Sequence, residues 1–415
     1  MSTGMSARIV IAGAGHAGVL LAEALRRDGC TAPIALVGDE PGLPYERPPL
    51  SKAYLSDSAV GEADVALRPA EFYAQHHITL IKGRRVLVLR RRERVVELDD
   101  GTRLEYGHLV FATGARCRQL DVPGACLSGV HTLRTRADAD RVRSRLRPGS
   151  RVVLIGAGFI GLEIASAAVA AGCDTTVVEV ADRVMGRAVS PAISAHATRV
   201  HERAGTRIHL RRGVVRICGR NGEVTGVETT DGAVLPADLV VVGIGVVPNV
   251  AAARTGGLET AGGIVVGEYL QTSDPAISAI GDCAVFPFEG RRVRLESVQN
   301  AADQARCVAA RLTGSPAPYR ALPWFWSHQG GMKLQIAGLR PAADELAESV
   351  VRGDPASGRF SVLTYRSGQL VCVESVNSPA DHLAARRLLT ANTSPDPATA
   401  TNPGIALRDL LRAAA

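Results

Sequence analysis

The sequence predicts an α/β protein that contains two dinucleotide-binding modules and ends in a smaller α+β domain. Two observations predict the modules: a strand–turn–helix–strand pattern occurs twice, and each copy carries a G-x-G-x-x-G turn, at Gly13 and again at Gly156. A third observation predicts the last domain, because short β-like stretches replace this pattern from PWFWSHQGG onward. A length of 415 residues with 46% hydrophobic residues is enough for more than one core.

The first module starts with the apolar run Ile9–Ala12 and continues into Gly13-Ala14-Gly15-His16-Ala17-Gly18. In such a turn the first glycine permits the tight bend and the second lets the backbone approach a pyrophosphate. The third allows the helix to pack closely on the strand. A second apolar run at 34–38 ends at Asp39, 21 residues beyond Gly18, where a carboxylate can accept from a ribose hydroxyl. The alternative is a purely structural glycine turn.

The second module repeats the pattern, with expected strands at 152–155 and 176–180 around Gly156-Ala157-Gly158-Phe159-Ile160-Gly161. Glu179, at the end of the second strand, favours NADH over NADPH because a 2′-phosphate would meet a carboxylate. Arg183 follows closely and could pair with a 2′-phosphate, which weakens this inference. Two modules imply two dinucleotides, and FAD with a nicotinamide is the economical pair for hydride transfer.

A third motif is Ser278-Ala279-Ile280-Gly281-Asp282-Cys283-Ala284. We expect a strand that ends at Gly281-Asp282, with Asp282 bonding a ribityl or phosphate-linked hydroxyl and a following helix pointing its N-terminus at the flavin. The alternative is a simple Gly-Asp turn. Ala112-Thr113-Gly114-Ala115 and Gly243-Ile244-Gly245 close strands, are equally compatible with structural turns, and are assigned no catalysis. Asp-Gly and Asn-Gly dipeptides predict hairpin turns after each module.

Composition narrows the function classes. Eight cysteines are scattered without C-x-x-C or C-x4-C spacing, which argues against a redox dithiol, a zinc site and an iron–sulfur site in this chain. No run of about 18 apolar residues predicts a transmembrane helix, and the N-terminus lacks a secretory layout, so we expect a soluble, cytoplasmic protein. The net charge of +7 is spread without aromatic interleaving, so nucleic acid is not predicted, but an acidic protein partner is compatible.

Four blocks carry a family resemblance: YERPPLSKAYL, GAGFIGLEIA, SAIGDCA with RLESVQNAADQAR, and PWFWSHQGGMKLQIAGL. From about residue 7 to about residue 385 the chain resembles the FAD-dependent, NADH-oxidising ferredoxin reductases of bacterial oxygenase systems. The resemblance implies a glutathione-reductase-like fold, with an FAD domain at 1–115 and 246–320, an NAD domain at 116–245 and a C-terminal domain at 321–415 that ends in a loose tail.

The resemblance also implies the site residues. It places the FAD pyrophosphate at Gly13, Gly15, Ala17 and Gly18, the adenosine ribose at Asp39, and the rest of the flavin among Lys52, Val86, Arg134, Asp282 and Val298. It places NADH at Gly156, Gly158, Gly161, Glu163, Glu179 and Gly245, and Trp324 and Trp326 at the ring edge where electrons leave. The implied partner is a small acidic 2Fe-2S ferredoxin or a Rieske-type component, and indirectly a terminal oxygenase. His328 stands where relatives commonly carry Asp, so the resemblance does not define the details of the surface where electrons leave, or the partner that binds there.

The expected catalytic pair is Lys52 with Glu163. Lys52 is the first of three lysines in an arginine-rich chain and follows Pro48-Pro49, which give a stiff entry to an expected helix over 50–55. A buried ammonium would stabilise negative charge on a flavin, and Glu163, expected in the first turn of the second helix, would fix its position. The alternatives are a solvated loop lysine and an acid that complements the helix dipole.

Two other functions fit the two-module pattern. An NADH oxidase or peroxidase would need a redox cysteine near the flavin, and no cysteine lies near residues 40–50. A flavoprotein with a structural or signalling role, similar to apoptosis-inducing factor, is disfavoured by the arginine-rich composition and the lack of a targeting segment.

Overall fold

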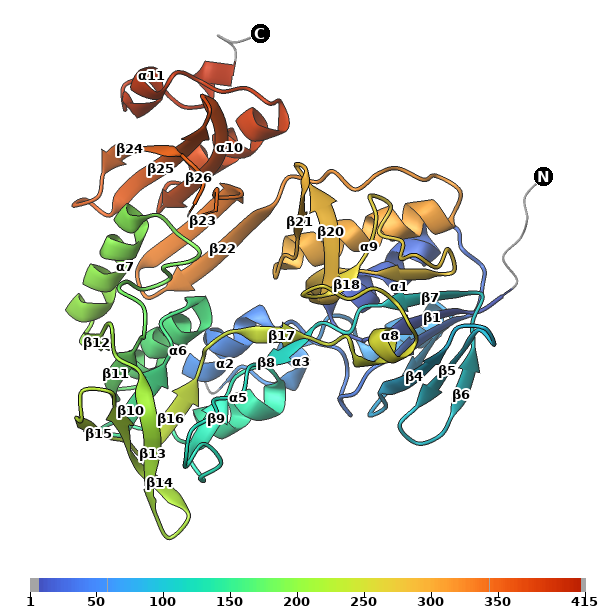
Figure 1. Cartoon of the computed structure of the whole chain (residues 1–415), viewed down its shortest axis with the longest axis horizontal. Coiled ribbons are helices and arrows are strands. Elements are labelled where there is room, and N and C mark those ends of the chain that lie inside the picture. Colours follow the sequence, from blue (N-terminus) through green and yellow to red (C-terminus); the bar gives the residue numbers. More distant parts are fainter. Residues whose placement is uncertain (1–6, 58, 343, 412–415) are drawn as a thin grey trace. The chain divides into compact units, whose positions relative to one another are not determined.

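The computed structural model describes residues 7–57, 59–342 and 344–411 (Figure 1). The chain forms two compact units. The first unit contains the chain up to Glu46, Gly61–Arg116 and Val246–Ala321, and the second contains Arg47–Val60, Cys117–Gly245 and the chain from Leu322 onward. Within the described residues, no helix has the length and apolar character needed to span a bilayer.

The first unit is built on a five-stranded parallel sheet in the order β19-β7-β1-β2-β3. Its strands are β1 (Ile9–Ala12), β2 (Ile34–Val37), β3 (Ile78–Ile81), β7 (His108–Phe111) and β19 (Ile277–Ala279). All residues of β1, β2 and β7 are buried, as expected for parallel strands with both faces covered. The predicted strands of the first module are therefore confirmed, and β1 lies at the centre of the sheet, between β2 and β7.

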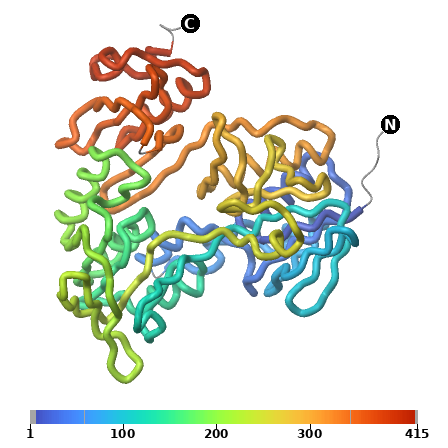
Figure 2. Tube along the Cα trace, viewed as in Figure 1, coloured from blue at the N-terminus to red at the C-terminus, as the bar shows by residue number. Residues whose placement is uncertain are grey.

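Segments far apart in the sequence complete this unit. Helices α1 (His16–Arg27) and α9 (Val298–Leu312) pack against each other, and Figure 2 shows the N-terminal and post-246 segments side by side. Two further three-stranded sheets belong to this unit, one antiparallel and one mixed. The remaining elements are α3 (Glu62–Val65), α4 (Ala70–Gln75), β4 (Val86–Arg90), β5 (Val95–Leu98), β6 (Arg103–Glu105), α8 (Ala251–Thr255), β18 (Ile264–Val265), η2 (Gly281–Cys283), β20 (Ala284–Phe288) and β21 (Arg291–Val293). Strands β8 (Ala115–Cys117) and β17 (Val246–Pro248) fall at the boundaries between the units.

The second unit repeats the parallel architecture, with the order β12-β11-β10-β16-β9. Its strands are β9 (Val130–Thr132), β10 (Arg151–Ile155), β11 (Asp174–Val178), β12 (Arg207–His209) and β16 (Leu239–Val242), and its helices are α5 (Arg136–Arg143), α6 (Phe159–Ala170) and α7 (Pro191–Arg203). An antiparallel sheet follows, made of β13 (Val214–Arg220), β14 (Glu223–Thr229) and β15 (Val234–Pro236). Asn221 and Gly222, between β13 and β14, have φ of 54° and 81°, so the Asn-Gly pair makes the predicted hairpin turn.

The C-terminal part of the second unit is an antiparallel sheet in the order β22-β23-β26-β25-β24, against which α10 packs. Its elements are β22 (Trp324–Gln329), β23 (Met332–Gly338), β24 (Glu348–Asp354), β25 (Arg359–Arg366), β26 (Gln369–Val376) and α10 (Pro379–Thr390). The predicted α+β texture is confirmed.

The prediction of a loose tail is wrong for the described residues. The tail forms α11 (Pro397–Thr401) and the short helix η3 (Asp409–Leu411), and Leu407 and Leu410 are buried in the same core cluster as α10. Arg352 of β24 donates hydrogen bonds to the carbonyl oxygens of Ala400, Asn402 and Ile405 at 2.7–2.9 Å. The alanine- and proline-rich composition suggests a loosely ordered tail until about Pro403, but the buried Ala400 and the bonds from Arg352 fix this segment. Two buried leucines fix the residues that follow.

A buried histidine gives the first unit a pH-dependent stability. His108 on β7 lies 3.0 Å from the hydroxyl of Ser278, which also accepts a bond from Arg311. Burial, and then the positive charge of Arg311, lower the pKa of His108 to about 3. The same side chain in an unfolded chain has a pKa of about 6.5. Acidification below that value therefore protonates the unfolded chain and leaves the native histidine neutral.

We predict that His108→Gln reduces the loss of stability on acidification. Between about pH 6.5 and pH 4 one such histidine lowers the free energy of unfolding by up to about 1.4 kcal/mol per pH unit. Denaturant melts at pH 7, 6, 5 and 4.5 measure the slope, and replacing the exposed His76 by Gln is the control. An unchanged slope in His108→Gln would contradict the assignment.

Candidate functional site

The first glycine-rich turn joins β1 to α1, and two of its glycines are required by packing within the protein. A Cβ on Gly13 would lie 2.1 Å from the carbonyl oxygen of Ala112, and φ of Gly13 is +121°. A Cβ on Gly18 would lie 1.9 Å from the carbonyl oxygen of Gly13. Any side chain at either position would push the turn away from the strands and α1 away from the turn.

Gly15 differs from its neighbours. It precedes α1 with an ordinary extended φ of −85°, and no atom of the described residues lies within 4 Å of a Cβ built there. Nothing in the protein therefore requires glycine at this position. The open space lies at the N-terminus of a 12-residue helix, where backbone N–H groups favour an anion. The turn thus fits the pyrophosphate of a dinucleotide.

The second glycine-rich turn, between β10 and α6, has the same division of roles. A Cβ on Gly156 would lie 2.5 Å from the carbonyl oxygen of Gly243, and one on Gly161 would lie 2.2 Å from that of Gly156. Gly158, with φ of −78°, again has no neighbour within 4 Å among the described residues. The second unit therefore contains its own open space at a helix N-terminus. We call these two spaces, at Gly15 and at Gly158, the first and second cradle, and each unit can hold one dinucleotide.

The two predicted ribose acids lie at the ends of the second strands of their sheets. Asp39 is exposed just after Gly38, whose Cβ would lie 2.7 Å from the Cβ of Ala14 in the first turn. Glu179 accepts hydrogen bonds from the backbone N–H of Ala157 at 2.7 Å and of Ala181 at 2.9 Å. Both acids therefore lie next to their glycine turns, as predicted.

Asp282 also lies close to the first turn. A Cβ on Gly281 would lie 3.1 Å from that of Ala17, so the Gly281-Asp282 motif meets the first turn of α1. The amide oxygen of the buried Gln304 accepts from the N–H of Gly281 at 2.7 Å and fixes this loop. A single 3-10 turn at Asp282 leads into β20, because the chain first forms the small β18-β20-β21 sheet before the expected helix begins. The long helix that follows, α9, starts at Val298.

The remaining predicted FAD and NADH residues divide between the units. Val86 is buried on β4 in the first unit. Arg134 lies in the second unit, where its carbonyl oxygen accepts a hydrogen bond of 2.5 Å from Arg47. Gly245, also in the second unit, has φ of +99° and no neighbour within 4 Å of its Cβ position among the described residues. Two of the predicted FAD residues, Lys52 and Arg134, thus belong to the unit that also carries the NAD fingerprint.

The expected single helix over 50–55 is wrong. Pro48–Ser51 form the 3-10 helix η1, Ala53–Ser56 form α2, and Lys52 separates them with φ of −129° and ψ of −114°. From there the ammonium of Lys52 reaches back to the carbonyl oxygen of Pro48 at 3.2 Å. The same ammonium lies 3.4 Å from the hydroxyl oxygen of Ser51 and 2.6 Å from Oε2 of Glu163.

Glu163 faces inward from α6, in the second turn of the helix rather than the first as expected. It is only 3% exposed, yet its carboxylate has three donors. Oε2 accepts from Lys52 at 2.6 Å and from Ser51 at 2.5 Å, and Oε1 accepts from Ser327 at 2.6 Å. The predicted Lys52–Glu163 pair is present, with one partner buried and the other 24% exposed at its side chain. A buried carboxylate with this many donors forms an ion pair with Lys52, and it is not a surface acid that complements the helix dipole.

Ser51 and Ser327 were not predicted from the sequence. The signal for Ser327 lies in the alternation of β22, where Ser327 and Gln329 occupy the buried phase and are both 0% exposed. Polar residues at buried strand positions indicate a polar partner in the core.

The two tryptophans of β22 lie together, with ring centroids 5.5 Å apart and planes 33° apart. The guanidinium of Arg386 lies 4.6 Å from the ring centroid of Trp324. The neighbouring His328 is exposed. Partial desolvation, and then the charges of Lys333 and Lys52, lower the pKa of His328. Lys52 is therefore close enough to act on this side chain electrostatically.

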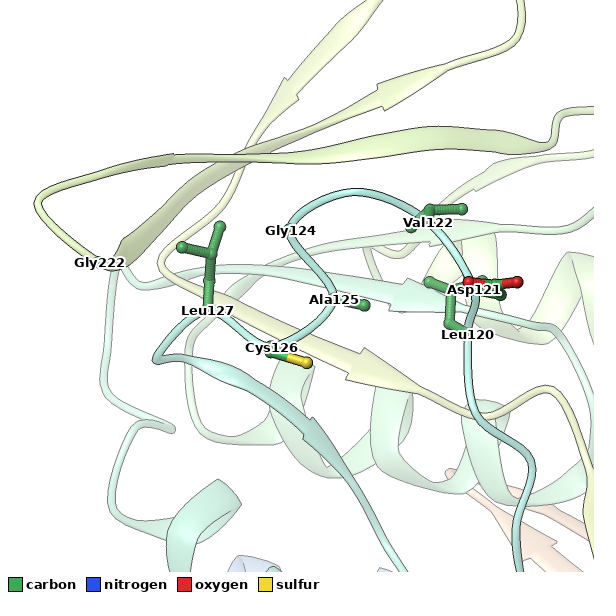
Figure 3. Close-up of a pocket in the computed structure, with 8 residues that line it drawn as sticks. All are labelled: Leu120, Asp121, Val122, Gly124, Ala125, Cys126, Leu127 and Gly222. Carbon is green, nitrogen blue, oxygen red and sulfur yellow. The ribbon is translucent and has the colours of Figure 1, made fainter.

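A surface hollow of about 450 Å³ also lies in the second unit (Figure 3). It is lined by residues 120–122 and 124–127 with Gly222 of the β13–β14 turn, mostly by apolar side chains and by the exposed Cys126. None of the fingerprint residues or the Lys52–Glu163 pair lines it, so we assign it no part in the site.

Comparison with known proteins agrees with this geometry. The model of the pyridine nucleotide-disulphide oxidoreductase family matches residues 7–305, and that of the reductase C-terminal family matches residues 324–411. Rhodocoxin reductase of Rhodococcus erythropolis is 51% identical over 96% of this chain and 93% of its own. Putidaredoxin reductase of Pseudomonas putida is 39% identical over 98% of this chain and 97% of its own.

Solved structures agree as well. The crystal structure of the ferredoxin reductase for the CYP199A2 system of Rhodopseudomonas palustris has a TM-score of 0.94 and 48% identity, covering 98% of this chain and 100% of that chain. The covalent putidaredoxin reductase–putidaredoxin complex has a TM-score of 0.95 and 38% identity, covering 98% of this chain and 99% of that chain. The family predicted from the sequence is thereby confirmed: the chain belongs to the pyridine nucleotide-disulphide oxidoreductases and, among them, to the FAD-dependent ferredoxin reductases.

Proposed function

We propose that this protein oxidises NADH and passes the electrons through FAD to a small acidic 2Fe-2S ferredoxin that supplies a bacterial oxygenase. One observation carries the proposal: Gly15 and Gly158 each border an open space at the N-terminus of a helix, and packing within the described residues does not require glycine at either position. Two such cradles in one chain fit two dinucleotides, one as donor and one as resident acceptor. The relatives named as rhodocoxin, putidaredoxin and ferredoxin reductases support the choice of partner.

The first cradle is assigned to FAD and the second to NADH. Asp39 would bind the adenosine ribose of FAD. Asp282, which follows Gly281 next to Ala17, would bind a hydroxyl further along the same cofactor. Glu179 would accept from the ribose of NADH while it holds the N–H of Ala157. Val86, Arg134 and Val298 would complete the FAD contacts, and Gly245 the NADH contacts.

Bound FAD supplies the chemistry of taking a hydride from NADH and releasing electrons singly to a one-electron carrier. The role proposed for Lys52 is to place a positive charge where negative charge develops on the ring. Its ammonium is a compact point charge, whereas a planar guanidinium with five donors would need a wider, flatter space. Glu163 holds that ammonium in place through a 2.6 Å ion pair. Such preorganised charge needs no rearrangement during the reaction.

Trp324 and Trp326 are proposed to lie at the electron exit. A net charge of +7 favours encounter with an acidic ferredoxin, with rates that fall as salt rises. We place the activity in the cytoplasm, where NADH is produced and where the eight free thiols would stay reduced.

The direct test is to purify the chain and record its absorbance spectrum. NADH is then added, first with ferricyanide and then with a 2Fe-2S ferredoxin. We expect a bound flavin spectrum and NADH-dependent reduction of both acceptors. A protein without flavin would overturn the proposal, and rapid NADH oxidation by oxygen alone would favour an oxidase.

A side chain that fills the first cradle should weaken FAD binding, and one that fills the second cradle should weaken NADH binding. Gly15→Val should reduce the flavin bound per chain, whereas Gly158→Val should keep FAD and raise the KM for NADH by more than about tenfold, equivalent to about 1.4 kcal/mol. Both sites have negative φ and open space, so the fold should tolerate the side chain. Gly331→Val, at an open glycine outside both turns, is the matched control. Equal effects of both variants on FAD and NADH would refute the assignment.

Glu179 should set the preference for NADH over NADPH. The competing Arg183 donates to the carbonyl oxygens of Val189 and Gly186, so its guanidinium is already engaged. We predict a higher kcat/KM with NADH for the unaltered protein and a smaller preference in Glu179→Gln, which keeps the shape and removes the charge that repels a 2′-phosphate. Steady-state kinetics with both nucleotides measure this, and a preference for NADPH in the unaltered protein would contradict it.

Lys52→Met should lower the reduction potential of the bound flavin and slow its reduction by NADH. A hydrogen bond to a charged group contributes about 1.5–3 kcal/mol, which corresponds to about 30–65 mV for a two-electron couple. Lys82→Met, at an exposed lysine of the first unit, is the control. Redox titration and stopped-flow absorbance give both quantities. If potential and rate were both unchanged, Lys52 would have no part in the chemistry.

A further inference from the structure

A chain of buried polar side chains continues from Glu163 away from Lys52. Ser327 donates to Oε1 of Glu163 at 2.6 Å, and Nε2 of Gln329 donates to the hydroxyl oxygen of Ser327 at 3.1 Å. Oε1 of Gln329 lies 3.1 Å from Nε2 of His201 on α7. Ser327 and Gln329 are 0% exposed and His201 is 2% exposed. All these residues belong to the second unit.

The register of β22 against α6 creates this chain. Alternate residues of a strand point to one face, so Phe325, Ser327 and Gln329 share a side. Phe325 packs on Phe159 of α6, with ring centroids 4.6 Å apart. One helical turn later Glu163 meets Ser327, and the next residue on this face of the strand reaches His201. An apolar contact therefore fixes the alignment, and the polar contacts follow from it.

The direction of every hydrogen bond in the chain is determined by Glu163. An ionised carboxylate can only accept, so the single proton of Ser327 is directed at it, and the oxygen of Ser327 must accept from Gln329. The amide nitrogen of Gln329 also lies 3.5 Å from the sulfur of Met185, so both amide protons have acceptors. The amide oxygen then faces His201, whose Nε2 must carry a proton. Burial lowers the pKa of His201, which leaves it neutral with that one proton at neutral pH.

We propose that Ser327, Gln329 and His201 are positioning residues for Lys52, which act by fixing the rotamer of the Glu163 carboxylate. This inference rests on the function proposed for Lys52. Donors on both carboxylate oxygens hold its plane: Ser51 and Lys52 on Oε2, and the chain from His201 on Oε1. A carboxylate held from one side alone could rotate about its terminal torsion and carry the ammonium with it.

The energetics favour a functional reason for this chain. A serine and a glutamine at fully buried strand positions cost desolvation that apolar residues of similar size would avoid. Here the bonds from His201 through Gln329 and Ser327 lead to Glu163, so the donors satisfy a carboxylate that would otherwise be buried with one oxygen unpaired. This hydrogen-bond chain therefore supplies the donor to Oε1 of Glu163. Because the carboxylate is then fixed, the position of Lys52 is fixed as well.

The first test measures the proton on His201 and needs no enzyme activity. Nitrogen NMR of histidine-labelled protein, with the signal assigned by its loss in His201→Gln, should show His201 protonated at Nε2 at neutral pH. Protonation at Nδ1 instead would reverse the direction of the chain and overturn the proposal. This measurement applies to the unaltered holoprotein, so it does not depend on how well any variant folds.

The second test is a double-mutant cycle on the flavin. Ser327→Ala should shift the flavin potential in the same direction as Lys52→Met and by less, because its effect reaches the flavin only through Lys52. It should slow reduction by about two- to tenfold, equivalent to about 0.4–1.4 kcal/mol. In the Lys52→Met background, Ser327→Ala should cause no further shift, because its effect passes through Lys52. A merely structural role would give the same increment in both backgrounds, and that outcome would overturn the proposal. His201→Gln is a second variant with the same expected pattern.

A matched control distinguishes the loss of the hydrogen-bond chain from general damage to α7. His196 lies on the same helix, is also buried, and packs edge-on against Phe360, with ring centroids 5.2 Å apart, outside the chain. His196→Gln should leave the potential unchanged. If Lys52→Met shifts the potential and Ser327→Ala does not, the positioning chain is wrong and the role of Lys52 stands. If Lys52→Met shifts nothing, the proposed role of Lys52 fails, whatever the tautomer of His201.

Discussion

The buried carboxylate of Glu163 is the constraint on which the second unit depends. A charge removed from water must be paired and hydrogen-bonded, and Glu163 finds its donors in segments 111 and 164 residues away. Satisfying it brings η1 and β22 to the same face of α6. It also explains why residues Arg47–Val60 cluster with the second unit although the chain on both sides belongs to the first. One carboxylate therefore links the predicted catalytic lysine to the module that we propose binds NADH.

The glycine-rich turns show a complementary constraint, in which packing and ligand binding act on different residues of one motif. At Gly13 and Gly18, and at Gly156 and Gly161, a side chain would collide with backbone of the same unit. At Gly15 and Gly158 the protein leaves space instead. Three glycines with the same spacing thus have two physical causes. The second cause connects fold to function, because the empty position lies at a helix N-terminus.

Local patterns predicted the local features well. The strands at Ile9–Ala12 and Ile34–Val37, both glycine turns and the Asn221-Gly222 hairpin follow from residues near one another in the sequence. The failures involve long-range contacts. The helix expected at 50–55 is broken at Lys52, whose side chain bonds Glu163, and the tail is ordered by burial and by Arg352. The sequence near each residue did not predict the roles of Ser327, Gln329 and His201, apart from placing polar residues at buried positions. Their partners are determined by how β22 aligns with α6.

We propose that the Lys52–Glu163 pair presents a fixed positive charge to the flavin. The most direct measurement is an experimental structure of the protein with FAD bound. We expect Nζ of Lys52 to lie within about 3.2 Å of a nitrogen or oxygen atom of the flavin ring and to keep its bond to Glu163. A Lys52 ammonium directed into solvent, or separated from the ring by more than about 6 Å, beyond the range of a close charge partner, would contradict it.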